Sequence, residues 1–371
     1  MSSTKYRALL AGCGRMGASQ AAILSTHADL SLAAVCDISL ENATKVGAEH
    51  NVPAFTDFSK ALAETKPDVV VICSSNTGHA PLTLEAVRFG VKGIYCEKPM
   101  ATNLADARAM VSECKARNTF LVINHQRRVS PDLVEIRRMI EAGAIGSLRT
   151  IRTQNQGDIL SDGTHAVDSL MFFLGDKAPE WVFGQLHRDL DALKKQDAQP
   201  GFRYGHVVES GGTAVIGFPN GIRAECTFGD LCAPRTPYQD FVIEGDKGRI
   251  WRTGDGTSPN VFLDNGQPGD HAVGIDQWMY KPIPAQPGQH APWKGIPVEK
   301  APKGGGITIS YALFAKSIRE GCDHPMSGER ALRGFEIIMA IYESARLHKK
   351  LSLPLQQERF PLEIMVEKGQ V

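Results

Sequence analysis

The sequence lacks the patterns of a metal-binding or disulfide-bonded protein. Its 371 residues contain eight cysteines, but no CxxC pair and no short cluster of Cys and His with zinc-site spacing. Several of these cysteines stand in short apolar runs, where a buried thiol behaves as a small hydrophobic residue. We therefore expect free thiols, no bound metal and a reducing compartment, which makes the protein cytoplasmic.

Long hydrophobic runs and an excess of charge of one sign are missing too. No apolar stretch approaches the ~20 residues of a membrane-spanning helix, and the N-terminus does not read as a signal peptide. The 41 Lys and Arg residues equal the 41 Asp and Glu residues. Because no broad basic field results, we expect a soluble protein that binds neither nucleic acid nor a membrane surface.

What is present predicts an α/β protein of two domains. In residues 1–125 strand and helix signals alternate, which indicates a Rossmann domain, a doubly wound parallel sheet. Residues 126–371 predict a second, α+β domain with an open, largely antiparallel sheet. Within it, residues 252–306 are rich in Gly, Pro and Asp, and their lack of periodicity predicts a long loop region. The predicted strands are residues 6–11, 30–36, 54–56, 68–73, 93–96, 120–124, 148–154, 180–186, 211–218, 222–227, 241–244 and 248–251.

The first predicted strand runs into a glycine-rich turn that opens a helix. The turn is a GxGxxG pattern made of Gly12, Cys13, Gly14, Arg15, Met16 and Gly17. In this context Gly12 permits the tight turn, Gly14 lets a pyrophosphate approach the backbone, and Gly17 lets helix and strand pack closely. The phosphates would lie on the helix N-terminus, beside Arg15 and Met16. The pattern predicts a dinucleotide site, although a glycine-rich turn without a ligand is the simpler alternative.

Asp37 ends the second predicted strand, about 20 residues after the glycines. A carboxylate there hydrogen-bonds the ribose hydroxyls of the adenosine and repels a 2′-phosphate, so it favours NAD over NADP. The alternative is that Asp37 caps the following helix.

Polar residues follow three further predicted strands of this half. A Lys at the carboxyl edge of a parallel sheet points into the crevice where ligands bind, as we expect for Lys98. The neighbouring residues would contact cofactor ribose and phosphates or form ordinary polar turns. The residues concerned are Ser74, Ser75, Asn76, His79, Glu97, Lys98 and Gln126, with Arg127 either in the substrate pocket or in a structural ion pair.

A second group of polar residues lies in the sequence SDGTHAVD, from Ser161 to Asp168. If a helix begins near Thr164, His165 and Asp168 lie one turn apart on one face. A His whose second nitrogen is held by a carboxylate is a good general base near neutral pH. A structural His beside a capping Asp is the alternative.

Together, the stretches AGCGRMG, GIYCEKPMA, INHQRRVSP and SDGTHAVDSLMFFLGD resemble the Gfo/Idh/MocA family of oxidoreductases. The resemblance implies substrates that are sugars, inositols and their derivatives. It implies that Lys98 touches the substrate and the nicotinamide ribose, and that the Lys98–Pro99 bond is often cis. It also implies that the open sheet pairs face to face, as a homodimer or homotetramer. The family commonly shows Asp-x-Gly-x-His, and this sequence has Ser161 four residues before His165, where Asp is frequent. Asp162 would replace that carboxylate or only orient His165.

These residues predict NAD-dependent, reversible oxidation of a secondary hydroxyl on a sugar, glycoside or cyclic polyol. NAD takes the hydride, and His165 or Lys98 takes the proton while the other polarises the oxygen. The substrate would contact Lys98, Arg127, Ser161, Asp162 and His165. Two alternatives stay open: a glycoside-cleaving enzyme that retains NAD and uses transient oxidation, and a non-enzymatic NAD-binding regulator. Aromatic residues in or near the long loops suit sugar rings, although most of them should pack: Tyr238, Trp278, Tyr280, His290 and Trp293.

Overall fold

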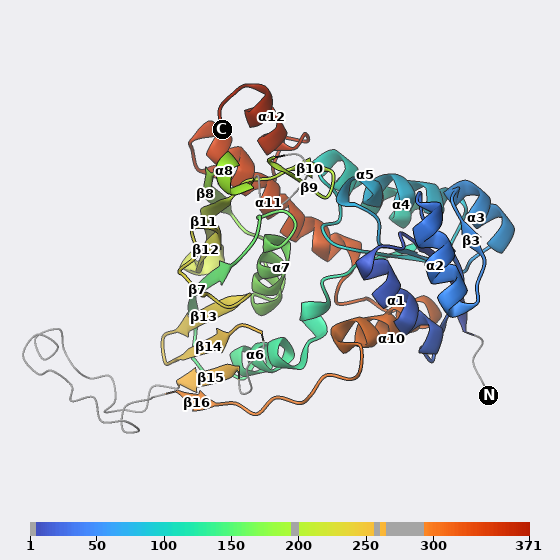
Figure 1. The fold of residues 1–371 in the computed structure, drawn as a ribbon. Helices are drawn as coiled ribbons and strands as arrows, with labels where there is room; N and C mark the ends of the chain where they lie inside the picture. The colour runs from blue at the N-terminus through green and yellow to red at the C-terminus, as the bar shows by residue number, and fades with distance from the viewer. Residues whose placement is uncertain (1–4, 194–199, 256–259, 265–292) are drawn as a thin grey trace, which may run out of the picture.

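The computed structural model describes residues 5–193, 200–255, 260–264 and 293–371. Two sheets dominate the fold (Figure 1): a six-stranded sheet in the N-terminal half and a nine-stranded sheet in the C-terminal half. None of the helices in the described residues is long and apolar enough to cross a membrane.

The N-terminal sheet is parallel throughout, with strand order β3-β2-β1-β4-β5-β6. All four residues of β4 are buried, as expected for a strand covered by helices on both faces. The strand order reverses between β1 and β4, and ligands of such sheets bind at that point, beyond the carboxyl ends of the strands. The Rossmann prediction is therefore confirmed. The strands are β1 Tyr6–Ala11, β2 Leu30–Cys36, β3 Ala54–Phe55, β4 Val69–Ile72, β5 Gly93–Cys96 and β6 Phe120–Ile123. The helices are α1 Arg15–Thr26, α2 Leu40–His50, α3 Phe58–Thr65, η1 Asn76–Gly78, α4 His79–Arg88, α5 Leu104–Ala116 and η2 Gln126–Val129.

The C-terminal sheet is open and largely antiparallel, as predicted. Its order is β16-β15-β14-β13-β7-β12-β11-β8-β17, and β7 with β12 is its parallel pair. Its strands are β7 Leu148–Asn155, β8 Trp181–His187, β11 Gly211–Gly217, β12 Arg223–Gly229, β13 Asp240–Gly245, β14 Arg249–Thr253, β15 Val261–Asp264, β16 Lys294–Gly295 and β17 Leu351–Ser352. A separate hairpin pairs β9 Phe202–Arg203 with β10 His206–Val207.

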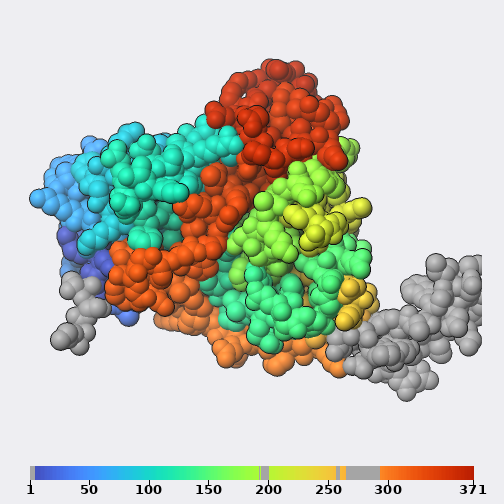
Figure 2. All heavy atoms as spheres, turned by 180° about the vertical axis from the view of Figure 1, so that it is seen from behind, coloured from blue at the N-terminus to red at the C-terminus, as the bar shows by residue number. Residues whose placement is uncertain are grey.

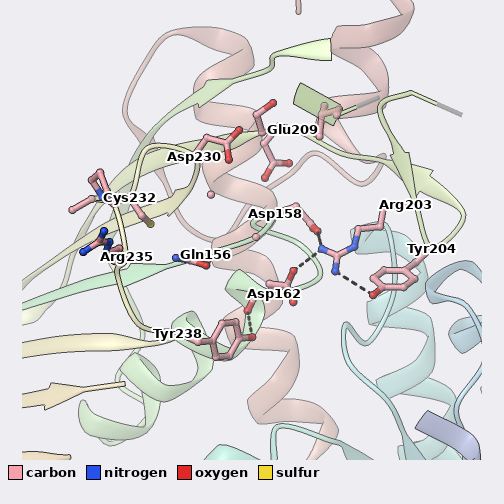
Figure 3. A pocket seen from close by; sticks show the side chains of 16 residues that line it. Gln156, Asp158, Asp162, Arg203, Tyr204, Glu209, Asp230, Cys232, Arg235 and Tyr238 are labelled. Atoms are coloured by element: carbon pink, nitrogen blue, oxygen red, sulfur yellow. Dashed lines mark hydrogen bonds and ion pairs between the residues drawn. The ribbon is translucent and has the colours of Figure 1, made fainter. Parts of the chain in front are cut away.

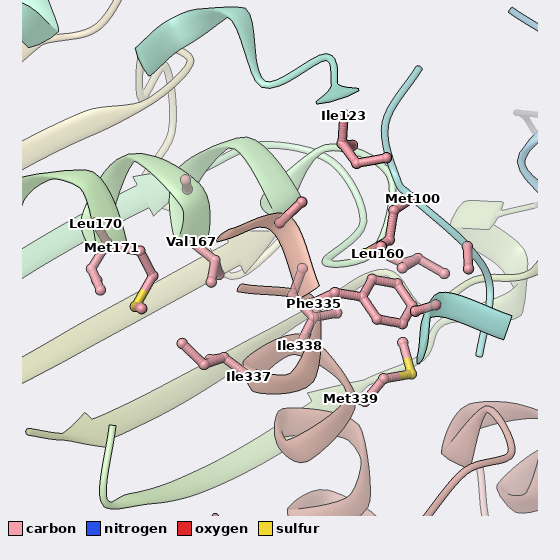
Figure 4. Close-up of a cluster of buried hydrophobic side chains, with 14 of the residues drawn as sticks. Met100, Ile123, Leu160, Val167, Leu170, Met171, Phe335, Ile337, Ile338 and Met339 are labelled. Carbon is pink, nitrogen blue, oxygen red and sulfur yellow. The ribbon is translucent and has the colours of Figure 1, made fainter. Parts of the chain in front are cut away.

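Helices α7 and α11 of the C-terminal half lie between the nine-stranded sheet and the Rossmann half (Figure 1). The side chains of α7 and α11 meet in a buried cluster that also takes in Met100 and Ile123 from the N-terminal half (Figure 4). One apolar core therefore continues from one half into the other, which fixes their relative position at the site between them. The helices are α6 Pro131–Glu141, α7 Gly163–Phe173, α8 Leu190–Leu193, η3 Pro219–Gly221, α10 Gly305–Glu320, α11 Gly328–Leu347 and α12 Pro361–Glu367.

Helix α10 returns from the C-terminal half to cover the Rossmann sheet. Its Tyr311 and Phe314 rings lie 4.5 Å and 5.8 Å, centroid to centroid, from the ring of Tyr95 on β5. Seen from behind, the orange and red C-terminal residues extend over both halves (Figure 2). The division at residues 125 and 126 stays a prediction, and α10 packs across it.

The structure differs from the sequence prediction in its short elements. The predicted loop region 252–306 contains β15 and β16, which extend the edge of the sheet, and α10 begins at Gly305, four residues before its predicted start. The β9–β10 hairpin, β17, α8 and α12 were not predicted, because elements of two to seven residues carry too little periodicity.

Candidate active site

The glycine-rich turn has three glycines with three different surroundings. Gly12 has φ +96°, and a Cβ on it would lie 2.4 Å from the backbone of Cys73. A Cβ on Gly17 would lie 1.9 Å from the carbonyl oxygen of Gly12. A Cβ on Gly14 would meet no atom within 4 Å, so Gly14 faces open space at the N-cap of α1. No side chain caps α1, and no acidic residue lies in its first turn, so its free N–H groups suit a phosphate.

A cleft of about 810 Å³ extends from this turn across the carboxyl ends of the parallel strands. At one end lie the glycines, Asp37 and the exposed Ile38; at the other lie Lys98 and Ser161. The lining also includes Arg15, Met16, Ser74, Ser75, Asn76, His79 and Glu97. An uncapped helix N-terminus, an open glycine and a long cleft fit a dinucleotide.

Asp37 is held by the main chain at the end of β2. Its Oδ2 accepts a hydrogen bond from the N–H of Cys13 at 2.6 Å, and its Oδ1 accepts one from the N–H of Ser39 at 2.8 Å. Ser39, and not Asp37, caps α2 through its side chain. The carboxylate is thus fixed beside the phosphate loop, where it can also accept from ribose hydroxyls.

Lys98 lies at the far end of the cleft, after a cis peptide bond to Pro99. Its Nζ donates to the carbonyl oxygen of Ser161 at 2.7 Å. The preceding Glu97 is buried and accepts from Gln20, from Asn124 Nδ2 at 2.7 Å and from the N–H of Lys98 at 3.2 Å. Burial raises the pKa of Glu97. Glu97 therefore holds the Lys98 backbone in place through this hydrogen bond, and it also lines the cleft.

His165 lies in the first turn of α7, which begins at Gly163 close to the predicted start. Its side chain is 4% exposed, and its Nδ1 has no hydrogen-bond partner among the described residues. Burial, followed by the nearby Lys98 cation, lowers the pKa of His165 well below its usual value. Burial and the Lys98 cation thus both favour the neutral imidazole of His165.

The expected pairing of His165 with Asp168 is wrong. The Asp168 carboxylate lies 2.7 Å from Nε of Arg128 and 3.5 Å from Nδ1 of His125, both in or beside η2. The His125 ring meets the His165 ring edge-on, with centroids 5.8 Å apart, and His125 Nε2 contacts Thr164 Oγ1 at 3.0 Å. The sequence analysis did not single out His125, and its place after β6 in INHQRR was the available signal.

Asp162 does not contact His165 through its carboxylate. Its Oδ2 lies 2.6 Å from Nη1 of Arg203, which also lies 2.9 Å from Oδ2 of Asp158. The Asp162 side chain makes no capping hydrogen bond to α7. Tyr238 Oη donates to the Asp162 carbonyl at 3.3 Å. Arg203 and Asp158, which sequence reasoning missed, thus surround Asp162, and neither expected role of its carboxylate is seen here.

Two of the polar residues after β4, Asn76 and His79, make hydrogen bonds to other parts of the protein. Asn76 is buried and its Nδ2 reaches Ser161 Oγ at 3.3 Å and His206 Nε2 at 2.9 Å. His79 is fully buried, and its ring nitrogens lie 2.6 Å from the carbonyl of Pro99 and 3.3 Å from that of Ser74. Burial lowers the pKa of His79 to about 4. Ser74 is half-buried and Ser75 is exposed, and both line the cleft, so their hydroxyls can also contact a cofactor.

Gln126 and Arg127 line a neighbouring cavity of about 520 Å³ beside α10. Arg127 makes two hydrogen bonds to Asp255, at 2.5 Å and 2.6 Å, and lies 5.4 Å from the ring centroid of Tyr238. This geometry matches the ion-pair alternative for Arg127. Trp293 packs on Trp251, with centroids 5.9 Å apart. Trp278, Tyr280 and His290 lie outside the described residues.

All eight cysteines are free, as predicted. Within the described residues, no group of three or more His, Cys, Asp or Glu side chains has the arrangement of a metal site.

Comparison with known proteins assigns both halves to one family. Residues 6–125 match the Gfo/Idh/MocA oxidoreductase family with an NAD-binding Rossmann fold, and residues 133–251 match a C-terminal domain of that family. The chain is 29% identical over 203 residues to the D-glucoside 3-dehydrogenase of Escherichia coli, which covers 49% of this chain and 58% of that protein. It is 26% identical over 266 residues to the myo-inositol 2-dehydrogenase of Thermotoga maritima, covering 64% of this chain and 78% of that protein.

The fold matches that of the aldose-aldose oxidoreductase from Caulobacter crescentus, solved with glycerol. The TM-score is 0.76 at 20% identity, covering 94% of this chain and 100% of that one. The fold is thus shared over 94% of this chain.

Proposed function

Because this chain belongs to the Gfo/Idh/MocA family of NAD-binding oxidoreductases, we propose that it oxidises a secondary hydroxyl of a sugar, glycoside or cyclic polyol, reversibly and with NAD. The observation that carries the proposal is the meeting of Lys98 with the loop before α7. The Lys98 ammonium, 2.7 Å from the Ser161 carbonyl, lies where the cleft that begins at the glycine-rich turn meets the C-terminal half.

Bound NAD supplies the hydride acceptor. The protein then has to take one proton and stabilise the oxygen that loses it. One of the three N–H donors of Lys98 is hydrogen-bonded to the Ser161 carbonyl, and the other two can donate to the substrate oxygen. Burial lowers the pKa of His165 and so favours its neutral imidazole, which has a lone pair ready to accept the hydroxyl proton. We therefore propose Lys98 and His165 as the acid–base pair, with His165 as acceptor.

The cofactor preference follows from Asp37. Its carboxylate is fixed by two main-chain N–H groups at the end of β2, so it cannot turn away from a 2′-phosphate without losing both. We propose NAD over NADP on that ground.

The open face of the nine-stranded sheet supports a homo-oligomer. In Figure 1, α6, α7 and α11 lie on one side of this sheet, and among the described residues no helix lies on the other. Phe183 on β8 is 37% exposed there, and Trp251 and Phe262 are partly exposed. We propose that this face pairs with a second copy in a homodimer or homotetramer. Phe183→Arg should then lower the mass measured by sedimentation, and an unchanged mass would refute the proposal.

We also propose a cytoplasmic location. Free cysteines, six of the eight buried, suit a reducing compartment.

A substrate panel tests the proposed activity. The protein would be incubated with NAD, or with NADP, and with sugars, inositols and glycosides, while reduced cofactor is measured. We expect NADH to accumulate with some member of the panel. Cleavage of a glycoside without NADH would favour the NAD-retaining, glycoside-cleaving alternative. Tight NAD binding without any turnover would favour a non-enzymatic regulator.

A further inference from the structure

A second cavity adjoins the cofactor cleft on the side of the C-terminal sheet (Figure 3). Its volume is about 830 Å³. Asp162, Arg203 and Tyr204 line both this cavity and the cofactor cleft, so they form the boundary between the two. The other lining side chains include Gln156, Asp158, Glu209, Asp230, Arg235 and Tyr238.

We propose that this cavity binds the second, hydroxyl-bearing ring of a glycoside, with Arg203 as the residue that selects for it. The proposal rests on the proposed function, because the first ring is the one oxidised beside Lys98. It narrows the substrate from sugars and polyols in general to glycosides of at least two rings.

The first argument is position. Lys98 and Ser161 lie at the end of the cofactor cleft, and Asp162, the next residue in the chain, already lines the second cavity. A ring held by Lys98 therefore has the Arg203 boundary as its neighbour. Because the two cavities share Asp162, Arg203 and Tyr204, a substituent on that ring can extend directly into the second cavity.

The second argument is the mixture of donors and acceptors. Each sugar hydroxyl both donates and accepts, so a ring site needs both kinds of group. Arg203 places Nη1 between Asp158 and Asp162 and donates from Nη2 to Tyr204 Oη at 3.1 Å. The Arg203 and Asp162 side chains remain 25% and 21% exposed, so both can also contact a ligand. The exposed Asp230 adds a further acceptor on the opposite wall.

The charges around Arg203 favour a neutral ring over an anionic one. One guanidinium already serves two carboxylates, at 2.9 Å and 2.6 Å. A carboxylated or phosphorylated substituent would have to compete with both for the same cation and would face their negative charge. Glu209, which also lines the cavity, accepts hydrogen bonds from the Ile159 N–H and from Tyr342 Oη, each at 2.7 Å. It therefore supplies no cation that could bind an anionic substituent.

The third argument is shape. The Tyr204 ring is 50% exposed and stacks 4.6 Å from the Arg203 guanidinium, and the Tyr238 ring lines the same cavity. Exposed aromatic faces suit the C–H faces of sugar rings. The volume also falls within the range of about 300–1,000 Å³ that holds ligands much larger than one monosaccharide.

Two variants and two substrate classes test the proposal. Steady-state kcat/KM would be measured for free hexoses and for the corresponding disaccharides. We expect wild type to prefer the disaccharides. Arg203→Gln should lower the ratio of the disaccharide kcat/KM to the hexose kcat/KM by about 10- to 100-fold, the usual cost of a lost charged hydrogen bond. Tyr204→Ala removes a half-exposed ring, which leaves the core intact, and should act in the same selective way. Arg138→Gln, an exposed arginine on α6, is the matched control and should change neither value.

Each outcome decides the question. A selective loss on disaccharides with unchanged NAD affinity supports the subsite. An equal loss on both classes would mean that Arg203 only positions the Ser161 loop, and it would overturn the subsite. Turnover of hexoses with no gain for disaccharides would also overturn it, while leaving the proposed function in place. No reduction of NAD by any compound would overturn both.

Discussion

Lys98 and Ser161 are joined by a hydrogen bond between the Lys98 Nζ and the Ser161 carbonyl oxygen, 2.7 Å apart. The lysine comes from the Rossmann half, and the carbonyl comes from the loop that leads into α7. Ser161 is itself fixed, since its N–H donates to Asp158 Oδ1 at 2.6 Å and its Oγ lies 3.3 Å from His206 Nε2. The reacting centre thus depends on the docking of the two halves, and the following predictions test its parts.

Removing either member of the acid–base pair should slow turnover without unfolding the protein. We expect Lys98→Ala and His165→Ala each to lower kcat by about 10²–10⁴-fold, the usual contribution of general acid–base catalysis. The double variant should lose less than the product of the two losses, because the residues act on one oxygen. Lys92→Ala, a lysine with a 58% exposed side chain, is the control. Wild-type kcat for His165→Ala from about pH 6 to pH 9 would remove His165 from the mechanism.

Two glycines of the same turn should respond differently to valine. Gly14→Val should fold normally and lose NAD binding, because its side chain enters space that is open in the protein and belongs to the pyrophosphate. Gly17→Val should instead lower Tm sharply, because its Cβ would lie 1.9 Å from the Gly12 carbonyl. Thermal melts and NAD titrations of both variants check this. A folded Gly14→Val protein with normal NAD affinity would refute the phosphate-loop assignment.

Asp37 should decide cofactor choice. We expect Asp37→Ala to weaken NAD binding by about 1–2 kcal/mol, as ribose hydrogen bonds are lost and the phosphate loop loses its anchor at Cys13. NADP binding should weaken less or improve, because the charge opposing its 2′-phosphate is gone. Titration with both cofactors measures this, with the exposed Glu113→Ala on α5 as control. Equal kcat/KM of the wild type with NAD and NADP would contradict the assignment.

His79 should make stability depend on pH. Its pKa is lowered to about 4 in the folded protein, against about 6.5 in an unfolded chain. The unfolded state therefore binds the proton first, so the stability that neutral His79 contributes is present above about pH 6.5 and is lost as pH falls towards 4. Between pH 7.5 and pH 5 the loss should be about 2 kcal/mol. Urea denaturation at both pH values would show a smaller loss for His79→Asn, and an equal loss in both proteins would contradict this.

The sequence was enough for features that depend on neighbours in the chain. The glycine turn after β1 and the cis Lys98–Pro99 bond appear as predicted, and α7 begins at Gly163, one residue from the predicted start near Thr164. Each is set by residues within one strand–turn–helix unit, so local pattern and family resemblance suffice.

Pairings between distant segments could not be predicted. Asp168 was expected beside His165, one turn away, but it pairs with Arg128 and lies near His125, some 40 residues earlier in the chain. Arg203 was missed because its hairpin has two-residue strands. In the structure Tyr204 and Gly205 have φ values of 52° and 89°, which fit a type I′ hairpin turn. The glycine at position 205 was the only sign of this turn in the sequence.

Transfer of deuterium from substrate to cofactor tests the central claim most directly. A glycoside deuterated at each ring carbinol carbon would be incubated with NAD and the protein, and the nicotinamide recovered for mass spectrometry and NMR. We predict one deuterium at C4 of the reduced nicotinamide, formed in equal amount to a ring ketone, and at least about 100-fold slower labelling with the Lys98→Ala, His165→Ala double variant. Unlabelled NAD, whether the glycoside is left unchanged or is cleaved, would contradict the account.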